Sequence, residues 1–169
     1  NEVWGVARFS AEGSRERAEA IGATTHVADL ASGDLDGLPD DFTHLVHFAA
    51  WQGKAVDHDR AIRANAEATG LLMAHCRKAE AALIASTNSV YRPNEDPMHR
   101  YTETDPLGDA TAPHSPTYGV SKVSQEAVAR TMARVLDLPT TVARINASYG
   151  PNGGLPAYHG DWVAAGQTV

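Results

Sequence analysis

Short apolar runs alternate with amphipathic stretches along this chain, in an order typical of βαβ units. Runs of Val, Ile, Leu, Thr and Ala predict strands over residues 2–7, 25–28, 44–49, 81–86 and 140–145. Because helical patterns separate most of these runs, we expect an α/β fold with a parallel sheet that helices cover on both faces.

Three stretches have helical spacing. Residues 14–21 predict a short helix closed by Gly22, since glycine suits the left-handed position after a helix. Residues 57–79 predict a longer one, with one stripe at three- and four-residue steps. The stripe consists of Ile62, Asn65, Thr69, Leu72 and Cys76.

A third helix is predicted from about residue 117 to 136. Ser115 and Pro116 precede it, as an expected N-cap and first-turn proline. Residues 92–116 contain five prolines and predict a long loop, a feature that is usually functional in a compact domain. From residue 150 onward, Gly and Pro are frequent and no clear strand is seen. We expect residues 1–149 to form one domain and residues 150–169 to begin a substrate-binding region.

The length of 169 residues suits one globular domain, and no apolar run approaches the ~20 residues that cross a bilayer. Asn1 is not an initiator Met, and the first residues look like the middle of a strand rather than a signal peptide. We therefore expect the natural protein to extend beyond both ends.

Charge and cysteine content narrow the range of partners. A net charge of −7 argues against nucleic acid and against anionic membrane surfaces. The single cysteine, Cys76, cannot form an internal disulfide, which suits a reducing compartment such as the cytoplasm. The eight histidines lack metal-ligand spacing, so no metal site is predicted.

Tyr118 and Lys122 are four residues apart, so their side chains share one helix face. A neighbouring ammonium stabilises a phenolate, which would let Tyr118 exchange protons as a general acid/base. The alternative is a half-exposed Tyr that packs on the stem of a solvated Lys.

Hydroxyl side chains follow the predicted strand 81–86. Ligands of open α/β sheets bind at the carboxyl ends of the strands, so Thr87 could hydrogen-bond a substrate oxygen there. Ser, Thr and Asn are also ordinary turn formers, and these residues could simply turn the chain.

Together, these features resemble the extended short-chain dehydrogenase/reductase superfamily, in its NAD(P)-dependent epimerase/dehydratase group. The resemblance covers almost the whole chain as an ordered set of motifs. The set runs Val6-Ala7-Arg8, Asp29-Leu30, His47-Phe48-Ala49-Ala50, Asn65, Ser86-Thr87, Val90-Tyr91, Tyr118-Gly119-Val120-Ser121-Lys122, Arg144-Ile145-Asn146 and Tyr149-Gly150-Pro151. The resemblance implies a doubly wound, NAD(P)-binding Rossmann-like domain that is incomplete at both ends.

The resemblance also implies roles for individual residues. Tyr118 would be the catalytic acid/base, Lys122 would bind the nicotinamide ribose, and Thr87 would hydrogen-bond the reacting oxygen. Asn65 matches a polar residue below the active site, or alternatively a structural Asn that bridges backbone groups. The remaining matches are Asp29 and Leu30 beside the adenine, Ala49 and Ala50 along the cofactor, and Ser89 and Asn146 near the substrate; a strand-end Asn such as Asn146 can equally be a turn residue.

Arg8 lies where a Rossmann fold reads the adenosine ribose. An acidic residue there bonds the 2′-hydroxyl of NAD, whereas an Arg accommodates the 2′-phosphate of NADP. NADP is therefore favoured over NAD, unless Arg8 is a surface residue without a ligand.

The departures from the family pattern are specific. The Gly-x-x-Gly-x-x-Gly segment that approaches the pyrophosphate is absent. Asn88 and Ser89 stand where 4,6-dehydratases carry an Asp-Glu pair, which argues against that reaction. Arg92 replaces the usual glycine after Val-Tyr.

The expected function is hydride transfer between NADP(H) or NAD(H) and a hydroxyl-bearing substrate, with epimerisation of a nucleotide-sugar as the expected outcome. The alternatives are an NADPH-dependent ketone or aldehyde reductase and a non-catalytic NAD(P)-sensing module. The protein could act as a homodimer, which the sequence does not decide.

In the strand order 3-2-1-4-5-6, the family's first strand lies between the strands expected at residues 2–7 and 44–49. This chain has no such strand, so we expect a gap there or another segment filling it. We also expect that these 169 residues alone neither bind a dinucleotide tightly nor form a stable monomer.

Overall fold

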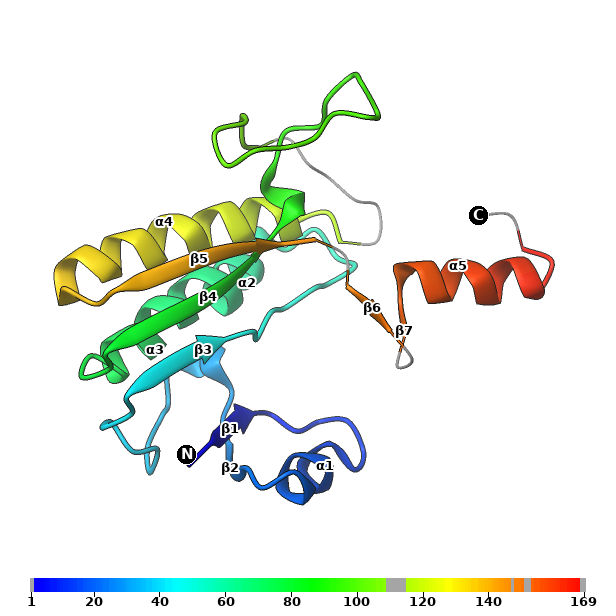
Figure 1. The fold of residues 1–169 in the computed structure, drawn as a ribbon. Coiled ribbons are helices and arrows are strands. Elements are labelled where there is room, and N and C mark those ends of the chain that lie inside the picture. Colours follow the sequence, from blue (N-terminus) through cyan, green and yellow to red (C-terminus); the bar gives the residue numbers. More distant parts are fainter. Residues whose placement is uncertain (1, 109–114, 147, 151–152, 168–169) are drawn as a thin grey trace.

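Parallel strands form the centre of the fold. The computed structural model describes residues 2–108, 115–146, 148–150 and 153–167. The strands β1 (Trp4–Ala7) and β2 (Thr24–Val27) form one parallel sheet. A second parallel sheet has the order β3-β4-β5 (Figure 1). Its strands are β3 (His44–His47), β4 (Ala81–Thr87) and β5 (Thr140–Ile145).

Helices connect successive parallel strands. The helix α1 (Ser14–Ala20) joins β1 to β2, and α4 (Tyr118–Leu136) follows β4 and leads to β5. The connection from β3 to β4 consists of α2 (His58–Ile62), a π-helical turn (Arg63–Glu67) and α3 (Ala68–His75). The expected single helix over residues 57–79 is thus interrupted by a π turn and ends at His75.

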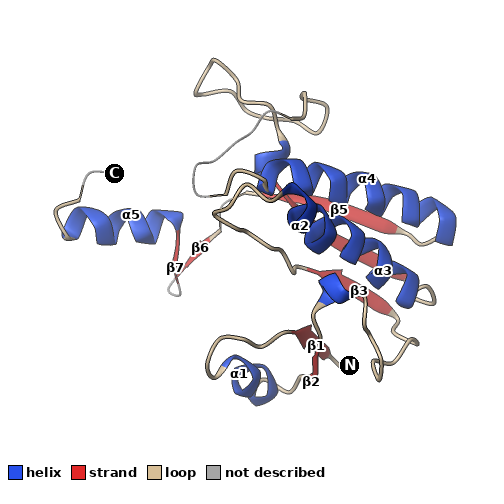
Figure 2. Cartoon of the chain, turned by 180° about the vertical axis from the view of Figure 1, so that it is seen from behind, coloured by secondary structure: helices blue, strands red, loops and turns tan. Residues whose placement is uncertain are grey.

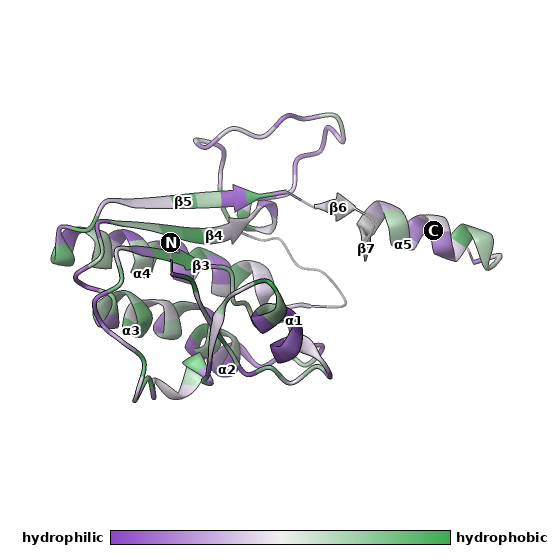
Figure 3. Cartoon of the chain, turned by 60° about the horizontal axis from the view of Figure 1, so that its bottom comes forward, coloured by the Kyte–Doolittle hydropathy of each residue, from purple (hydrophilic) through white to green (hydrophobic). Residues whose placement is uncertain are grey.

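Within the described residues, helices cover only one face of the β3-β4-β5 sheet (Figures 2 and 3). On β3, Leu45 and His47 are buried, while His44 and Val46 are exposed. The two crossovers of this sheet have the same hand and therefore place α3 and α4 on the same side. The parallel strands with their connecting helices confirm the expected α/β, Rossmann-like fold class. The core lies between this sheet and the two helices, where Met73, Ile84 and Ala129 are fully buried.

The strands β1 and β3 belong to separate sheets and do not pair. A cavity of about 560 Å³ lies between them, with Trp4, Val6, Leu45 and Leu72 in its lining. The expected gap at this place is confirmed.

The start of α4 differs from the prediction. Thr117 is the N-cap residue, and Ser115 contributes its carbonyl oxygen, which accepts a hydrogen bond from the backbone N–H of Tyr118 at 3.2 Å. The Ser115 side chain does not cap the helix. Of the expected loop 92–116, residues 92–108 contain neither helix nor strand, and residues 109–114 lie outside the described residues.

The tail is more regular than the sequence indicated. Short strands β6 (Tyr149–Gly150) and β7 (Gly153–Gly154) pair antiparallel and lead into α5 (Leu155–Ala164). Pro156 lies in the first turn of α5, where its missing N–H costs nothing. No helix in the described part of the chain is long and apolar enough to cross a bilayer.

Candidate active site

The first turns of α4 carry Tyr118 and Lys122. The Lys122 Nζ lies 6.0 Å from the centre of the Tyr118 ring, so the two groups share one helix face as predicted. Lys122 is only 2% exposed, and its Nζ donates a hydrogen bond of 2.7 Å to the carbonyl oxygen of Ala85 on β4. Burial lowers the pKa of Lys122 to about 8, against the opposing attraction of Glu126. The ammonium is therefore held rigidly and only partly solvated.

Thr87 ends β4 at its carboxyl end. Its Oγ1 accepts a hydrogen bond of 3.2 Å from the backbone N–H of Ser89, which caps a short 3-10 turn. The next residue, Asn88, donates from Nδ2 to Oδ1 of Asn146 beyond β5, at 3.0 Å. The ends of β4 and β5 are thus tied together beside the Thr87 hydroxyl.

One cavity of about 910 Å³ gathers most of the predicted reaction residues. Tyr118, Lys122, Thr87, Ser89 and Asn146 all line it. They come from α4 and from the carboxyl ends of β4 and β5, the edge at which ligands bind in open α/β sheets.

Asn65 does not line this cavity. Its Nδ2 donates to Ser121 Oγ at 2.8 Å, and Ser121 Oγ in turn donates to the carbonyl oxygen of Tyr118 at 2.8 Å. Asn65 also makes two hydrogen bonds with the backbone of Trp51. Asn65 therefore bridges backbone groups, as the structural alternative expects, while its place in the catalytic set stays a prediction.

A second cavity, of about 440 Å³, gathers the predicted cofactor residues. Arg8, Asp29, Leu30, Ala49 and Ala50 line it. Ala50 lies in the wall of both cavities, so the two are neighbours. Asp29 follows the carboxyl end of β2, and its carboxylate accepts a hydrogen bond of 3.1 Å from the backbone N–H of Ala31. This bond fixes the orientation of the carboxylate.

Sequence reasoning missed several residues of these cavities. The guanidinium of Arg60 lies 5.3 Å from the Trp51 ring, and both line the smaller cavity. Ser115 lines the larger one, and its buried hydroxyl has no hydrogen-bond partner among the described residues. Only Trp51 could have been found, since it directly follows the Ala49-Ala50 segment.

A chain of buried polar groups lies behind Lys122. Thr69 Oγ1 donates to the carbonyl oxygen of Asn65 at 2.7 Å and accepts from Gln125 Nε2 at 2.8 Å. Because the single hydroxyl proton of Thr69 is used, His47 Nε2 must be the donor in its 2.9 Å contact with Thr69. Burial, and secondly the charge of Lys122, lower the pKa of His47 to about 4. His47 is therefore neutral at physiological pH.

The fold is shared with several proteins of known structure. The UDP-glucuronic acid 4-epimerase from Bacillus cereus, in complex with NAD, superposes with a TM-score of 0.73 at 24% identity, over 90% of this chain and 51% of that chain. The Bordetella bronchiseptica enzyme WbmG, in complex with NAD, gives 0.75 at 22% identity, over 100% and 53%. The dTDP-glucose 4,6-dehydratase from Bacillus anthracis gives 0.66 at 23% identity, over 89% and 47%.

This chain thus spans about half the length of these structures. No curated protein sequence matches it. The family comparison is decisive, since the NAD dependent epimerase/dehydratase family matches residues 1–164, nearly the whole chain. The chain therefore belongs to the NAD dependent epimerase/dehydratase family.

Proposed function

We propose that the protein is an NAD(P)-dependent enzyme that epimerises a nucleotide-sugar, with Tyr118, Lys122 and Thr87 as its catalytic set. The main observation behind this proposal is that two cavities adjoin, because Ala50 lines both of them. One cavity holds the three reaction residues, and the other holds Arg8, far from them in sequence.

The residues present fit a dinucleotide that extends across both cavities. In the smaller cavity, Arg8 offers a cation and Asp29 a carboxylate at the ends of β1 and β2, the edge where an adenosine ribose is read. In the larger one, Lys122 would hold the nicotinamide ribose, and Ser115 offers a hydroxyl without a partner among the described residues. When bound, the nicotinamide supplies the acceptor and donor of a hydride.

The protein's own residues supply the proton chemistry. Tyr118 takes the proton of a substrate hydroxyl as that carbon is oxidised, and returns it afterwards. The Nζ of Lys122 lies 6.0 Å from the centre of the Tyr118 ring, on the same helix face. Thr87 donates a hydrogen bond to the same substrate oxygen, which stabilises the developing charge.

We assign the substrate to the outer part of the larger cavity. Ser89 and Asn146 present a hydroxyl and an amide there, which suits the many hydroxyls of a sugar. Gly154, at the end of the β6-β7 hairpin, lines the same cavity. Its position supports residues 150–169 as the start of the substrate-binding region.

We further propose that NADP is preferred over NAD because of Arg8. A guanidinium can form a bidentate, charge-assisted contact with the 2′-phosphate of NADP, which NAD lacks. Arg60 lines the same cavity and adds a second positive charge.

The test is turnover of UDP-sugars and dTDP-sugars by the full-length enzyme, with product analysis and nicotinamide absorbance recorded together. Epimerisation inverts a hydroxyl with no net change in nicotinamide absorbance. Net consumption of NADPH with a ketone or aldehyde would instead identify a reductase. Dinucleotide binding without turnover of any such substrate would identify a sensing module and contradict the proposal.

A further inference from the structure

Glu126 is a buried carboxylate one turn after Lys122 on α4, and only 2% of it is exposed. Arg144 on β5 forms a bidentate ion pair with this carboxylate: Nε donates to Oε1 at 2.9 Å, and Nη2 donates to Oε2 at 2.8 Å. Ser86 Oγ donates to Oε1 at 2.6 Å. Burial alone would raise the pKa of Glu126, but the hydrogen bonds from Arg144 and Ser86 outweigh it and lower the pKa. The pair is therefore ionised, and α4, β4 and β5 meet at it.

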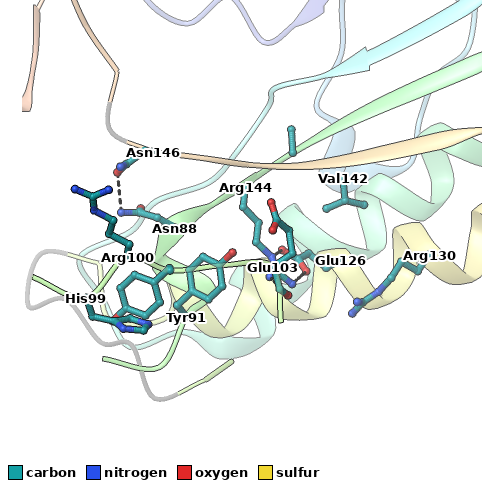
Figure 4. Close-up of a pocket in the computed structure, with 12 residues that line it drawn as sticks. Asn88, Tyr91, His99, Arg100, Glu103, Glu126, Arg130, Val142, Arg144 and Asn146 are labelled. Carbon is teal, nitrogen blue, oxygen red and sulfur yellow. Dashed lines mark hydrogen bonds and ion pairs between the residues drawn. The ribbon is translucent and has the colours of Figure 1, made fainter. Parts of the chain in front are cut away.

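Arg144 also reaches beyond this ion pair. Its Nη1 donates to the backbone carbonyl oxygen of Glu103 at 3.0 Å, and its guanidinium lies 4.9 Å from the centre of the Tyr91 ring. Figure 4 shows these side chains converging beside a cavity of about 780 Å³. One side chain of the sheet thus contacts both the helix with the catalytic pair and the long loop.

The loop that Arg144 contacts covers residues 92–107 and projects from the sheet before it returns close to its starting point (Figure 1). Its two ends are paired, because the backbone N–H of Arg92 donates to the carbonyl oxygen of Pro106 at 2.8 Å. Inside it, Tyr101 stacks on Tyr91 with ring centres 4.8 Å apart, and its hydroxyl donates to the Arg92 carbonyl oxygen at 3.1 Å. The loop therefore has a defined shape whose contact with the sheet runs through Tyr91 and Arg144.

Two residues of this loop, Pro93 and Tyr101, line the same cavity as Tyr118 and Lys122. The placement of the loop consequently sets one wall of the space assigned to the substrate. No residue of the loop lines the smaller cavity around Arg8.

We propose that Arg144, held in place by Glu126, is a positioning residue that fixes the 92–107 loop against the reaction cavity and so determines which substrate fits it. The effect on substrate rests on the function proposed above; the fixing of the loop does not. Arg144 acts through Tyr91, Tyr101 and the Glu103 carbonyl rather than by touching the reacting atoms.

Loop fixation can be measured by amide hydrogen exchange in the full-length protein. The deciding variant is the double substitution Glu126→Gln with Arg144→Gln, which leaves no unpaired buried charge. The amides of Arg92 and of Gly108, which donates to Val90 at 2.9 Å, should exchange about tenfold or more faster, while those in the middle of α4 stay protected.

Arg130→Gln is the matched control. Arg130 lies on α4 and lines the same 780 Å³ cavity. Among the described residues it acts on Glu126 through its charge, without a hydrogen bond to Glu126 or to the loop, so its removal should leave loop exchange unchanged. If the double variant does not fold, Arg144→Lys decides instead, since lysine keeps the charge but cannot grip Glu126 with two donors. Unchanged loop exchange in the folded variant would overturn the proposal.

The consequence for substrate is read from steady-state kinetics. The double variant should raise KM for the sugar substrate about tenfold or more, keep kcat within about threefold and leave the dinucleotide Kd unchanged. Faster loop exchange with an unchanged KM would refute the role in substrate choice. A protein that turns over no sugar nucleotide would contradict the proposed function, while the exchange result would still decide whether Arg144 fixes the loop.

Discussion

Asn65 holds the backbone of Trp51 at both of its polar groups: Oδ1 accepts from the Trp51 N–H at 2.6 Å, and Nδ2 donates to the Trp51 carbonyl oxygen at 3.0 Å. This segment follows β3 and has no sheet partner, so Asn65 satisfies groups that a strand would otherwise satisfy. The π-helical turn Arg63–Glu67 contains Asn65, and π turns are frequent at functional sites. The turn connects the wall of the smaller cavity to the first turn of α4 through Ser121.

We expect Asn65→Ala to destabilise the protein strongly. The substitution leaves the half-buried N–H and carbonyl of Trp51 without these partners, at up to about 1–3 kcal/mol each. The measurement is urea unfolding of full-length protein at neutral pH. Asn94→Ala, which removes an exposed loop amide, is the control and should change the free energy of unfolding by less than about 0.5 kcal/mol. An equally small effect at Asn65 would show that water can replace it.

Tyr118→Phe should reduce turnover by about 10²- to 10⁴-fold, because phenylalanine keeps the ring but has no proton to exchange. Dinucleotide affinity should hardly change. Single-turnover kinetics and cofactor titration check the two parts separately. Thr131→Val, which removes an exposed hydroxyl further along α4, is the control and should keep full activity. A Tyr118→Phe enzyme with more than about a tenth of the normal rate would exclude Tyr118 as the acid/base.

His47 should make the fold sensitive to acid. Its pKa is lowered from 6.5 to about 4 in the folded protein, first by burial and then by Lys122. Between pH 6.5 and 4, His47 is protonated in the unfolded chain but stays neutral in the folded protein. The free energy of unfolding therefore falls as the pH drops from 6.5 towards 4. This shift corresponds to about 3 kcal/mol.

Urea unfolding of wild type and His47→Gln between pH 7.5 and 4 separates the effect of His47 on stability from the effect of the carboxylates, which titrate in the same range. Glutamine can still donate to Thr69 but does not titrate, so the variant should lose less stability in acid than the wild type. His44→Gln, on the exposed side of the same strand, should behave like the wild type. Parallel pH profiles for wild type and His47→Gln would contradict the prediction.

Arg8→Asp should reverse or abolish a preference for NADP. A charge-assisted contact between Arg and phosphate contributes about 1.5–3 kcal/mol, or roughly 10- to 150-fold in affinity. Titration of the full-length enzyme with NAD and NADP measures it. Arg63→Asp makes the same charge change at an exposed position that lines neither cavity. Equal dissociation constants for the two dinucleotides in the wild type would refute the claim.

The sequence predicted what local periodicity and motif order encode. The strand at Thr140–Ile145 and the helix ending at Leu136 fall where the apolar pattern placed them. The contacts of Glu126 with Ser86 and Arg144 could not be predicted, because they join residues 40 and 18 positions apart. The Ser-Pro pair before α4 resembled a helix cap, yet tertiary packing turned Ser115 towards the cavity.

The unpaired edges of β1 and β3 lead to a prediction about the 169 residues by themselves. Between these strands lies a cavity of about 560 Å³ with apolar side chains such as Trp4 and Leu45 in its walls. Backbone groups without partners and exposed apolar walls are both costly, so we expect a broad, weakly cooperative thermal transition and strong binding of a hydrophobic dye. We also expect no tight dinucleotide binding. Calorimetry and NADP titration of these 169 residues provide the measurement. A sharp transition with an unfolding enthalpy near 0.7 kcal/mol per residue, roughly the norm for globular domains, together with micromolar NADP binding, would show that the fold tolerates the gap.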